Sequence, residues 1–262
     1  MAKPLPYNRQ NALASSIASD NATQIAGKIV LTTGVSPGGL GATFVEQVAK
    51  HKPALLILAG RNPSKVQATI DKLAANEQTA SVPTRILVLD LSSQKKICEA
   101  AEQVLQYPED RIDVLVNSAG VMGGPYKKTE EGIELQFGSN YLGHFLFTNL
   151  IMPKLLAAEH ARIVNVSSGG HRYSGIRFDD WNFQDGKTYN PWIAYGQSKT
   201  GNILFSKALA KKLGPRGLRA YSLHPGVNLD TSLSGAEQGG FSDDDVASLS
   251  TYTTASTPGD GQ

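Results

Sequence analysis

Short apolar runs alternate with longer amphipathic stretches along most of the chain, from Lys28 onward. Runs that are apolar at nearly every position are typical of strands covered on both faces. Such runs predict strands at Ile29 to Thr32, Ala54 to Ala59, Thr84 to Leu89, Ile112 to Val116, Arg162 to Val166 and Leu218 to Leu223.

Helix signals fill the gaps between these runs. The spacing of Leu40, Phe44 and Val48 places three apolar side chains on one helical face. Asn62 followed by Pro63 is typical of a helix N-terminus. The repeated order of strand, helix and strand predicts an α/β fold with a doubly wound, Rossmann-type parallel sheet in one domain. Residues 12–26 predict a leading helix within an N-terminal extension, residues 1–26.

Composition narrows the classes of partner and compartment. The formal net charge is +2 and the basic residues are scattered, which argues against a nucleic-acid surface. The sequence has neither a signal peptide pattern at its start nor an apolar stretch that predicts a membrane span. Cys98, the single cysteine, suits a reducing compartment. We therefore expect a cytoplasmic protein that acts on a small molecule.

A glycine-rich segment, Thr33 to Gly41, joins the first predicted strand to the first predicted helix. In a parallel sheet, ligands bind at the carboxyl ends of the strands, and free N–H groups at a helix N-terminus can meet a pyrophosphate. The alternative is a plain glycine-rich turn. We expect a dinucleotide here, with contacts from Gly34, Ser36, Gly39, Leu40 and Gly41.

The residues after the next three strands bear on which dinucleotide is bound. Arg61 stands where an acidic residue would accept hydrogen bonds from the ribose of NAD, and a guanidinium there suits the 2′-phosphate of NADP(H). The alternative is a solvated surface arginine. Asp90 and Asn117 follow the third and fourth strands, and either contact the adenosine half or brace the sheet.

Tyr195 and Lys199 lie four residues apart in a predicted helix, so both side chains share one face. A free phenol has a pKa near ~10 and needs a nearby positive charge to act as a base at neutral pH, which an ammonium can provide. Ser168 follows the fifth strand at the same sheet edge. Its hydroxyl can bond a substrate oxygen while Tyr195 exchanges a proton with it.

With these motifs in this order, residues 27–233 resemble the short-chain dehydrogenases/reductases. The likeness covers the glycine loop, Asn117 to Gly120, Ser168, the Tyr195 and Lys199 pair, and Pro225-Gly226. The segment from Thr129 through Leu142 to Phe145 is similar to the retinol dehydrogenase and WW-domain oxidoreductase subgroup, and the glycine loop is similar to fungal members.

The resemblance implies an NADP-binding domain and further site residues. Asn140 would hold a water that links Lys199 to solvent, and the alternative is a polar residue inside a helix that is bonded locally. Val227, Asn228 and Thr231 would lie against the nicotinamide carboxamide. It also implies a homodimer through the helix that carries Tyr195. Relatives continue past Pro225-Gly226 with a helix and another strand, whereas residues 234–262 are polar and predict a disordered tail and a shortened C-terminal part.

Together these features favour an NADP(H)-dependent oxidoreductase that interconverts an alcohol and a ketone or aldehyde, with a place in secondary-metabolite biosynthesis suggested by the fungal likeness. The alternatives are a non-catalytic NADP-binding protein and a non-redox isomerase. The histidines have no metal-binding spacing, so we expect no metal and treat His144, His171 and His224 as structural. The aromatic residues between Gly169 and Ile193 either wall a substrate pocket or pack at the sheet edge.

Overall fold

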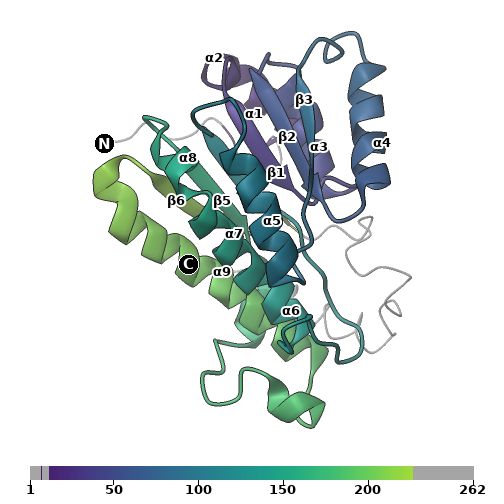
Figure 1. The fold of residues 1–262 in the computed structure, drawn as a ribbon, viewed down its shortest axis with the longest axis vertical. Helices are drawn as coiled ribbons and strands as arrows, with labels where there is room; N and C mark the ends of the chain where they lie inside the picture. The colour runs from purple at the N-terminus through teal and green to yellow at the C-terminus, as the bar shows by residue number, and fades with distance from the viewer. Residues whose placement is uncertain (1–6, 8–11, 227–262) are drawn as a thin grey trace, which may run out of the picture.

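Within the described part of the chain, the fold is built on a parallel sheet of six strands in the order β3-β2-β1-β4-β5-β6. The computed structural model describes residue 7 and residues 12–226 (Figure 1). The strands are β1 (Ile29–Thr33), β2 (Leu55–Gly60), β3 (Thr84–Val88), β4 (Val114–Asn117), β5 (Arg162–Val166) and β6 (Arg219–Leu223). Each of the six runs predicted from the sequence forms a strand, with ends within about two residues of the prediction.

Helices connect the strands and lie on both faces of the sheet (Figure 1). Those described are α1 (Ala14–Asp20), α2 (Ala22–Ile25), α3 (Leu40–Ala49), α4 (Pro63–Ala74), α5 (Gln94–Leu105), α6 (Leu135–Phe137), α7 (His144–Leu150), α8 (Met152–Leu156) and α9 (Pro191–Leu213). A π-helix, Gly138–Gly143, joins α6 to α7.

Among the described residues, two buried apolar clusters hold the layers together. One cluster joins the sheet to α5, α7 and α9 through residues such as Val104, Phe147 and Phe205. The other joins it to α3 and α4 through residues such as Val45 and Val66. Because β1 and β2 lie between the two clusters, their apolar side chains are buried on both faces, which is why these runs could be recognised from the sequence.

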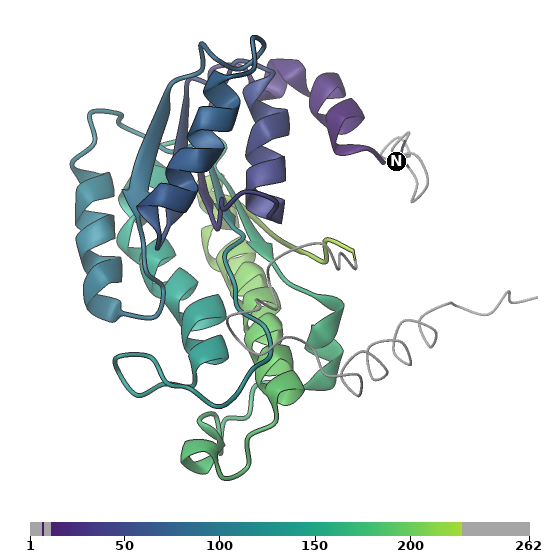
Figure 2. The ribbon, with the colours of Figure 1, turned by 90° about the vertical axis from the view of Figure 1, so that its right-hand side faces the viewer.

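The expected leading helix is present but broken. It forms α1 and α2, which meet at Asn21, where the backbone leaves helical geometry with φ −108° and ψ 17°. Figure 2 shows this helix pair beside α3. The capped helix start at Asn62 is confirmed, since its side chain accepts hydrogen bonds from the N–H groups of Ser64 (2.9 Å) and Lys65 (3.2 Å).

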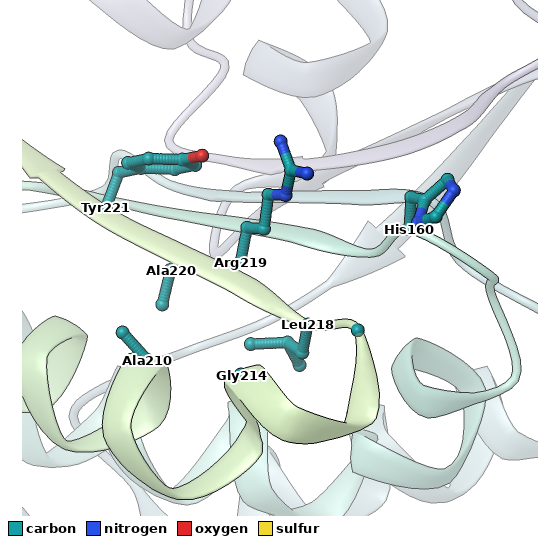
Figure 3. A pocket seen from close by; sticks show the side chains of 8 residues that line it. His160, Ala210, Gly214, Leu218, Arg219, Ala220 and Tyr221 are labelled. Carbon is teal, nitrogen blue, oxygen red and sulfur yellow. The ribbon is translucent and has the colours of Figure 1, made fainter.

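The expectation of two covered faces does not hold along β6, the last strand of the sheet within the described residues. Tyr221 and Leu223 remain 48% and 42% exposed. Figure 3 shows a hollow here, with Arg219 and Tyr221 on one side of β6 and Ala220 facing Ala210 of α9 on the other. The predicted tail, residues 234–262, lies outside the described residues.

None of the helices in residues 12–226 combines the length and the apolar character needed to cross a membrane.

Candidate active site

The glycine loop lies between β1 and α3, at the carboxyl edge of the sheet. Gly34 has φ +74°, and a Cβ at this position would come within 2.6 Å of the Cα of Ala119, which follows β4. Only glycine allows the two segments to approach so closely. Ser36 and Gly39 form the turn, in which the Gly39 N–H donates to the Ser36 carbonyl over 3.0 Å, and Leu40 and Gly41 begin α3.

The three residues after β2, β3 and β4 have different surroundings. Arg61 is exposed and makes no ion pair with the described residues. Asp90 accepts hydrogen bonds from the N–H and hydroxyl of Ser92, at 3.0 and 2.6 Å. Partial burial opposes ionisation of Asp90, but these bonds and the ammonium of Lys96 hold its pKa below the usual value.

Asn117 is buried, and its side chain points into the interior. Its amide nitrogen donates to Asn165 on β5 (2.8 Å) and to Thr148 on α7 (3.1 Å). The side chain therefore braces the sheet, one of the two roles considered from the sequence, which leaves its main chain for any contact with a cofactor.

Tyr195 lies one turn inside α9, which starts at Pro191. Asn190 caps this helix, since its side-chain oxygen accepts from the N–H groups of Trp192 and Ile193, both at 3.0 Å. The Tyr195 side chain lies close to Ser168, which directly follows β5: a Cβ at Gly170 would lie 2.8 Å from the Tyr195 ring and 3.4 Å from the Ser168 hydroxyl oxygen. Burial raises the pKa of Tyr195 to about 12, although the nearby Ser168 hydroxyl acts in the opposite direction.

Lys199 is buried on the same face of α9, one turn further on. Its nitrogen lies 5.4 Å from the centre of the Tyr195 ring and donates to the Val166 carbonyl at the end of β5 over 3.0 Å. Burial lowers the pKa of Lys199 to about 8. From the sequence we expected this ammonium to lower the pKa of Tyr195. In the structure, burial has the largest effect on the pKa of each of these two groups. The phenol of Tyr195 is therefore protonated at neutral pH.

Asn140 is held in the π-helix and is fully buried. Its side chain bonds Val121 twice, accepting from the N–H (2.8 Å) and donating to the carbonyl (2.9 Å), and also donates to Ser198 (3.1 Å). Local side-chain bonding was the alternative to a water-holding role, and the side chain adopts it. A Cβ at Gly120 would lie 3.3 Å from the Asn140 side-chain oxygen and 3.6 Å from the Lys199 nitrogen, so Asn140 and Lys199 meet at this glycine.

The structure thus brings Ser168, Tyr195, Lys199 and Asn140 together at one end of the sheet, near the segment after β4 that also contacts the glycine loop. Val227, Asn228 and Thr231 lie outside the described residues. Within those residues no group of His, Cys, Asp and Glu side chains could hold a metal ion. None of these site residues lines the hollow at β6.

The segment after Ser168 contains a left-handed turn that the sequence did not indicate. Phe183, Gln184 and Asp185 have φ of 57°, 47° and 56°, values rare outside glycine. Contacts with the segment after β4 hold the turn, because Asn182 bonds Gly132 and Glu134 and Asp185 pairs with Lys128 over 2.8 Å. Such strain persists only where the surroundings over-determine it.

The aromatic residues of this segment divide between two environments. Phe183 is buried and packs edge-on to Tyr189, which packs in the same way on Tyr126, with ring centroids 5.5 and 5.3 Å apart. Phe178 and Trp181 are 78% and 42% exposed. The first group packs beneath the loop, whereas the second faces solvent.

Two functional candidates were missed by sequence reasoning. Glu134 is buried and accepts bonds from the N–H groups of Gln136 and Phe137, and burial raises its pKa to about 7. His144, treated as structural, contacts both Asn140 and Thr33. The only available signal for His144 was its position in the Leu142 to Phe145 motif.

Comparisons with known proteins agree with this fold. The family model described as short chain dehydrogenase matches residues 28–179. The chain therefore belongs to the short-chain dehydrogenase/reductase family. Human retinol dehydrogenase 13 is 42% identical over 203 residues, covering 78% of this chain and 60% of that protein. An uncharacterized oxidoreductase of Schizosaccharomyces pombe is 40% identical over 212 residues, covering 78% of this chain and 61% of that protein.

Within the family, the chain belongs to the retinol dehydrogenase-like subgroup, as its motifs indicated. The chain spans about 60% of the length of human retinol dehydrogenase 13.

Solved structures show the same fold. A crystal structure of an uncharacterized protein from Mycobacterium paratuberculosis matches with a TM-score of 0.66 and 33% identity, covering 90% of this chain and 79% of that chain. A short chain dehydrogenase from Shigella flexneri, solved in complex with NADP, matches with a TM-score of 0.59 and 25% identity, covering 77% of each chain.

Proposed function

We propose that this protein is an NADP(H)-dependent oxidoreductase that interconverts an alcohol and the corresponding aldehyde or ketone. The observation that carries the proposal is the position of the Tyr195 and Ser168 side chains, which meet at Gly170 at the carboxyl edge of the sheet, with Lys199 one helical turn away. This arrangement offers a hydroxyl pair for one substrate oxygen and a cation beside it.

The protonation states favour carbonyl reduction. Because burial raises the pKa of Tyr195 to about 12, its hydroxyl carries a proton at neutral pH and can donate it to the oxygen of a substrate carbonyl. The Ser168 hydroxyl bonds the same oxygen. A protonated Lys199 favours the phenolate that remains after the proton has left. NADPH, when bound, supplies the hydride.

The residues of the glycine loop fit a dinucleotide. Gly38 has φ +77° and open space where a Cβ would stand, so a phosphate can approach the loop backbone. Helix α3 begins directly after the loop and presents its free N–H groups there. Arg61, exposed beyond β2, would hold the 2′-phosphate, and the NADP complex of the Shigella flexneri relative supports the same choice of cofactor.

The pyrophosphate would be contacted by Ser36, Gly39, Leu40 and Gly41. The adenosine half of the cofactor would be contacted by Asp90 and by the main chain of Asn117. The carboxamide of the nicotinamide would be contacted by Val227, Asn228 and Thr231. The water of a proton relay would bind the main-chain carbonyl of Asn140, because the Asn140 side chain is already hydrogen-bonded to Val121 and Ser198. The names of the relatives point to an apolar substrate of the retinol and retinal kind. No comparison supports a secondary-metabolite setting, and we do not propose one.

A homodimer through α7 and α9 belongs to the same proposal. Phe145 on α7 and Leu204 on α9 are each 42% exposed, and Phe145 packs against Phe205 with ring centroids 5.0 Å apart. An exposed apolar surface of this kind suits a partner. Sedimentation velocity of the wild type and of Leu204→Glu tests it, with a change from dimer to monomer expected.

The function is tested by following NADPH absorbance in the presence of a panel of aldehydes and ketones that includes retinal. We expect NADPH oxidation by the wild type and none by Tyr195→Phe. Conversion of substrate without a net change in NADPH would instead identify an isomerase. NADPH binding with no conversion of any substrate would identify a binding protein.

A further inference from the structure

His144 is the first residue of α7 and is completely enclosed. Its two ring nitrogens contact different parts of the fold. Nδ1 lies 3.0 Å from the carbonyl oxygen of Asn140, and Nε2 lies 2.9 Å from the hydroxyl of Thr33, the last residue of β1. One imidazole therefore connects the π-helix to the strand that leads into the glycine loop.

The hydrogen bonds of Thr33 determine which nitrogen carries the proton. Its hydroxyl oxygen accepts from the N–H groups of Ser118 and Ala119, each at 3.0 Å. A hydroxyl has two lone pairs and one proton, so both lone pairs are used and the proton must be donated to Nε2 of His144. Nε2 is then an acceptor, and Nδ1 carries the proton that is donated to Asn140. Burial lowers the pKa of His144 to about 4, which agrees with this neutral form.

One end of this connection reaches the glycine loop, and the other end reaches the surroundings of Lys199. On the Thr33 side, Ala119 lies against Gly34 of the glycine loop. On the Asn140 side, the side chain of Asn140 bonds Val121 and Ser198, and Ser198 is adjacent to Lys199 in α9. The side chains of Thr33, His144 and Asn140 are buried, and each has a partner for every donor and acceptor, a condition under which polar networks fix a single geometry.

We propose that His144 is a positioning residue that fixes the glycine loop relative to the part of the site around Lys199. It does so through one hydrogen bond to Thr33 and one to Asn140. The inference rests on the proposed oxidoreductase function. Loss of the bond to Thr33 affects cofactor binding, and loss of the bond to Asn140 affects proton transfer.

Two substitutions separate the two bonds. In His144→Gln the side-chain oxygen occupies the place of Nε2 and accepts from Thr33, whereas no donor reaches Asn140. In His144→Asn the amide occupies the place of Nδ1 and donates to Asn140, whereas nothing reaches Thr33. Thr33→Ser keeps the hydroxyl and serves as the matched control for Thr33→Val, which removes it.

We expect His144→Gln to bind NADPH within about 2-fold of the wild-type Kd, measured by fluorescence titration without substrate, and to lose roughly 10-fold in kcat at saturating NADPH. We expect His144→Asn and Thr33→Val to raise the Kd for NADPH roughly 5- to 10-fold, with a smaller loss in kcat. Thr33→Ser should resemble the wild type. Equal effects of the two His144 variants on both measurements, or no effect, would overturn the proposal.

A spectroscopic measurement on the wild type tests the geometry without any reference to turnover. Nitrogen-15 NMR of the histidine side chains is expected to show one imidazole held as the Nδ1–H tautomer between about pH 5.5 and pH 8, lost in His144→Gln. An Nε2–H tautomer, or titration near the ordinary pKa of about 6.5, would refute the connection. If instead this signature is present and no carbonyl is reduced, the proposed function fails while the geometry stands.

Discussion

The ammonium nitrogen of Lys199 donates a hydrogen bond to the main-chain carbonyl oxygen of Val166 over 3.0 Å. The same carbonyl accepts from Asn202 of α9 at 3.2 Å, so two turns of this helix are attached to the end of β5. Ser168 follows two residues later. The bond therefore sets the face of α9 that carries Tyr195 opposite the hydroxyl of Ser168.

Tyr195→Phe removes the hydroxyl near Ser168 and keeps the ring that fills the space. Because the hydroxyl is the proposed proton donor, kcat is expected to fall about 100- to 10,000-fold. The Kd for NADPH should stay within about 2-fold, since the variant leaves the glycine loop untouched. Turnover is followed by NADPH absorbance and binding by fluorescence titration. Activity within a few-fold of the wild type would contradict the assigned role.

The pH dependence of reduction should reflect Lys199, whose pKa burial lowers to about 8. Its charge favours the phenolate left by proton donation, so the kcat for carbonyl reduction is expected to fall as the pH rises through about 8 and Lys199 becomes neutral. Lys199→Met should lower kcat and abolish this break in the profile. A break that persists unchanged in Lys199→Met would assign the titration to another group.

Arg61 is expected to determine the preference for NADPH over NADH. A charge-assisted hydrogen bond to the 2′-phosphate contributes about 1.5–3 kcal/mol, so Arg61→Gln should weaken NADPH binding roughly 10- to 150-fold and leave NADH binding nearly unchanged. Lys65→Gln, which removes a charge from the start of α4, is the matched comparison and should have a smaller effect. An unchanged ratio of the two dissociation constants in Arg61→Gln would move the assignment to Lys65 or Ser36.

The sheet and the pairing of Tyr195 with Lys199 could be predicted because both leave local patterns in the sequence. Strands such as β1 and β2 are buried on both faces, which demands apolar residues at almost every position. Tyr195 and Lys199 share a helical face simply through their spacing.

Other features of the site depend on tertiary contacts. The partner of Lys199 is a main-chain carbonyl, which no side-chain pattern reveals. Asn140 owes its position to a π-helix, and the left-handed turn at Phe183 and Asp185 uses residues that locally disfavour it. In both places surrounding contacts, such as the bonds of Asn182, outweigh local preference.

Gly170→Ala is expected to disturb Tyr195 directly. A Cβ at Gly170 would lie 2.8 Å from two ring carbons of Tyr195, and the buried ring has little room to move away. Overpacking of this kind costs about 1–3 kcal/mol, so both the free energy of unfolding and kcat should fall. Gly175→Ala is the control, because no atom lies within 4 Å of its Cβ position. Denaturant unfolding and NADPH turnover are measured on both variants. Equal behaviour of the two would refute the close contact.

His144 should make the folded state sensitive to mild acid. Its pKa falls from the ordinary 6.5 to about 4 on burial, with the charge of Lys199 acting in the same direction. Above about pH 6.5 the imidazole is neutral in both the folded and unfolded states, and between about pH 6.5 and pH 4 only the unfolded chain binds the proton. The free energy of unfolding is therefore expected to decrease over this range by about 3 kcal/mol on account of His144.

Glu134 complicates the wild-type curve, because burial raises its pKa to about 7 and its protonation favours the folded state as the pH falls. His144→Gln keeps Glu134, so the difference between wild type and variant isolates the histidine. Urea unfolding at intervals between pH 4 and pH 7.5, at constant ionic strength, should give a steeper acid loss in the wild type than in His144→Gln. Parallel curves for the two proteins would show that His144 accepts a proton as readily in the folded state as in the unfolded chain, and would contradict its burial as a neutral donor to Asn140.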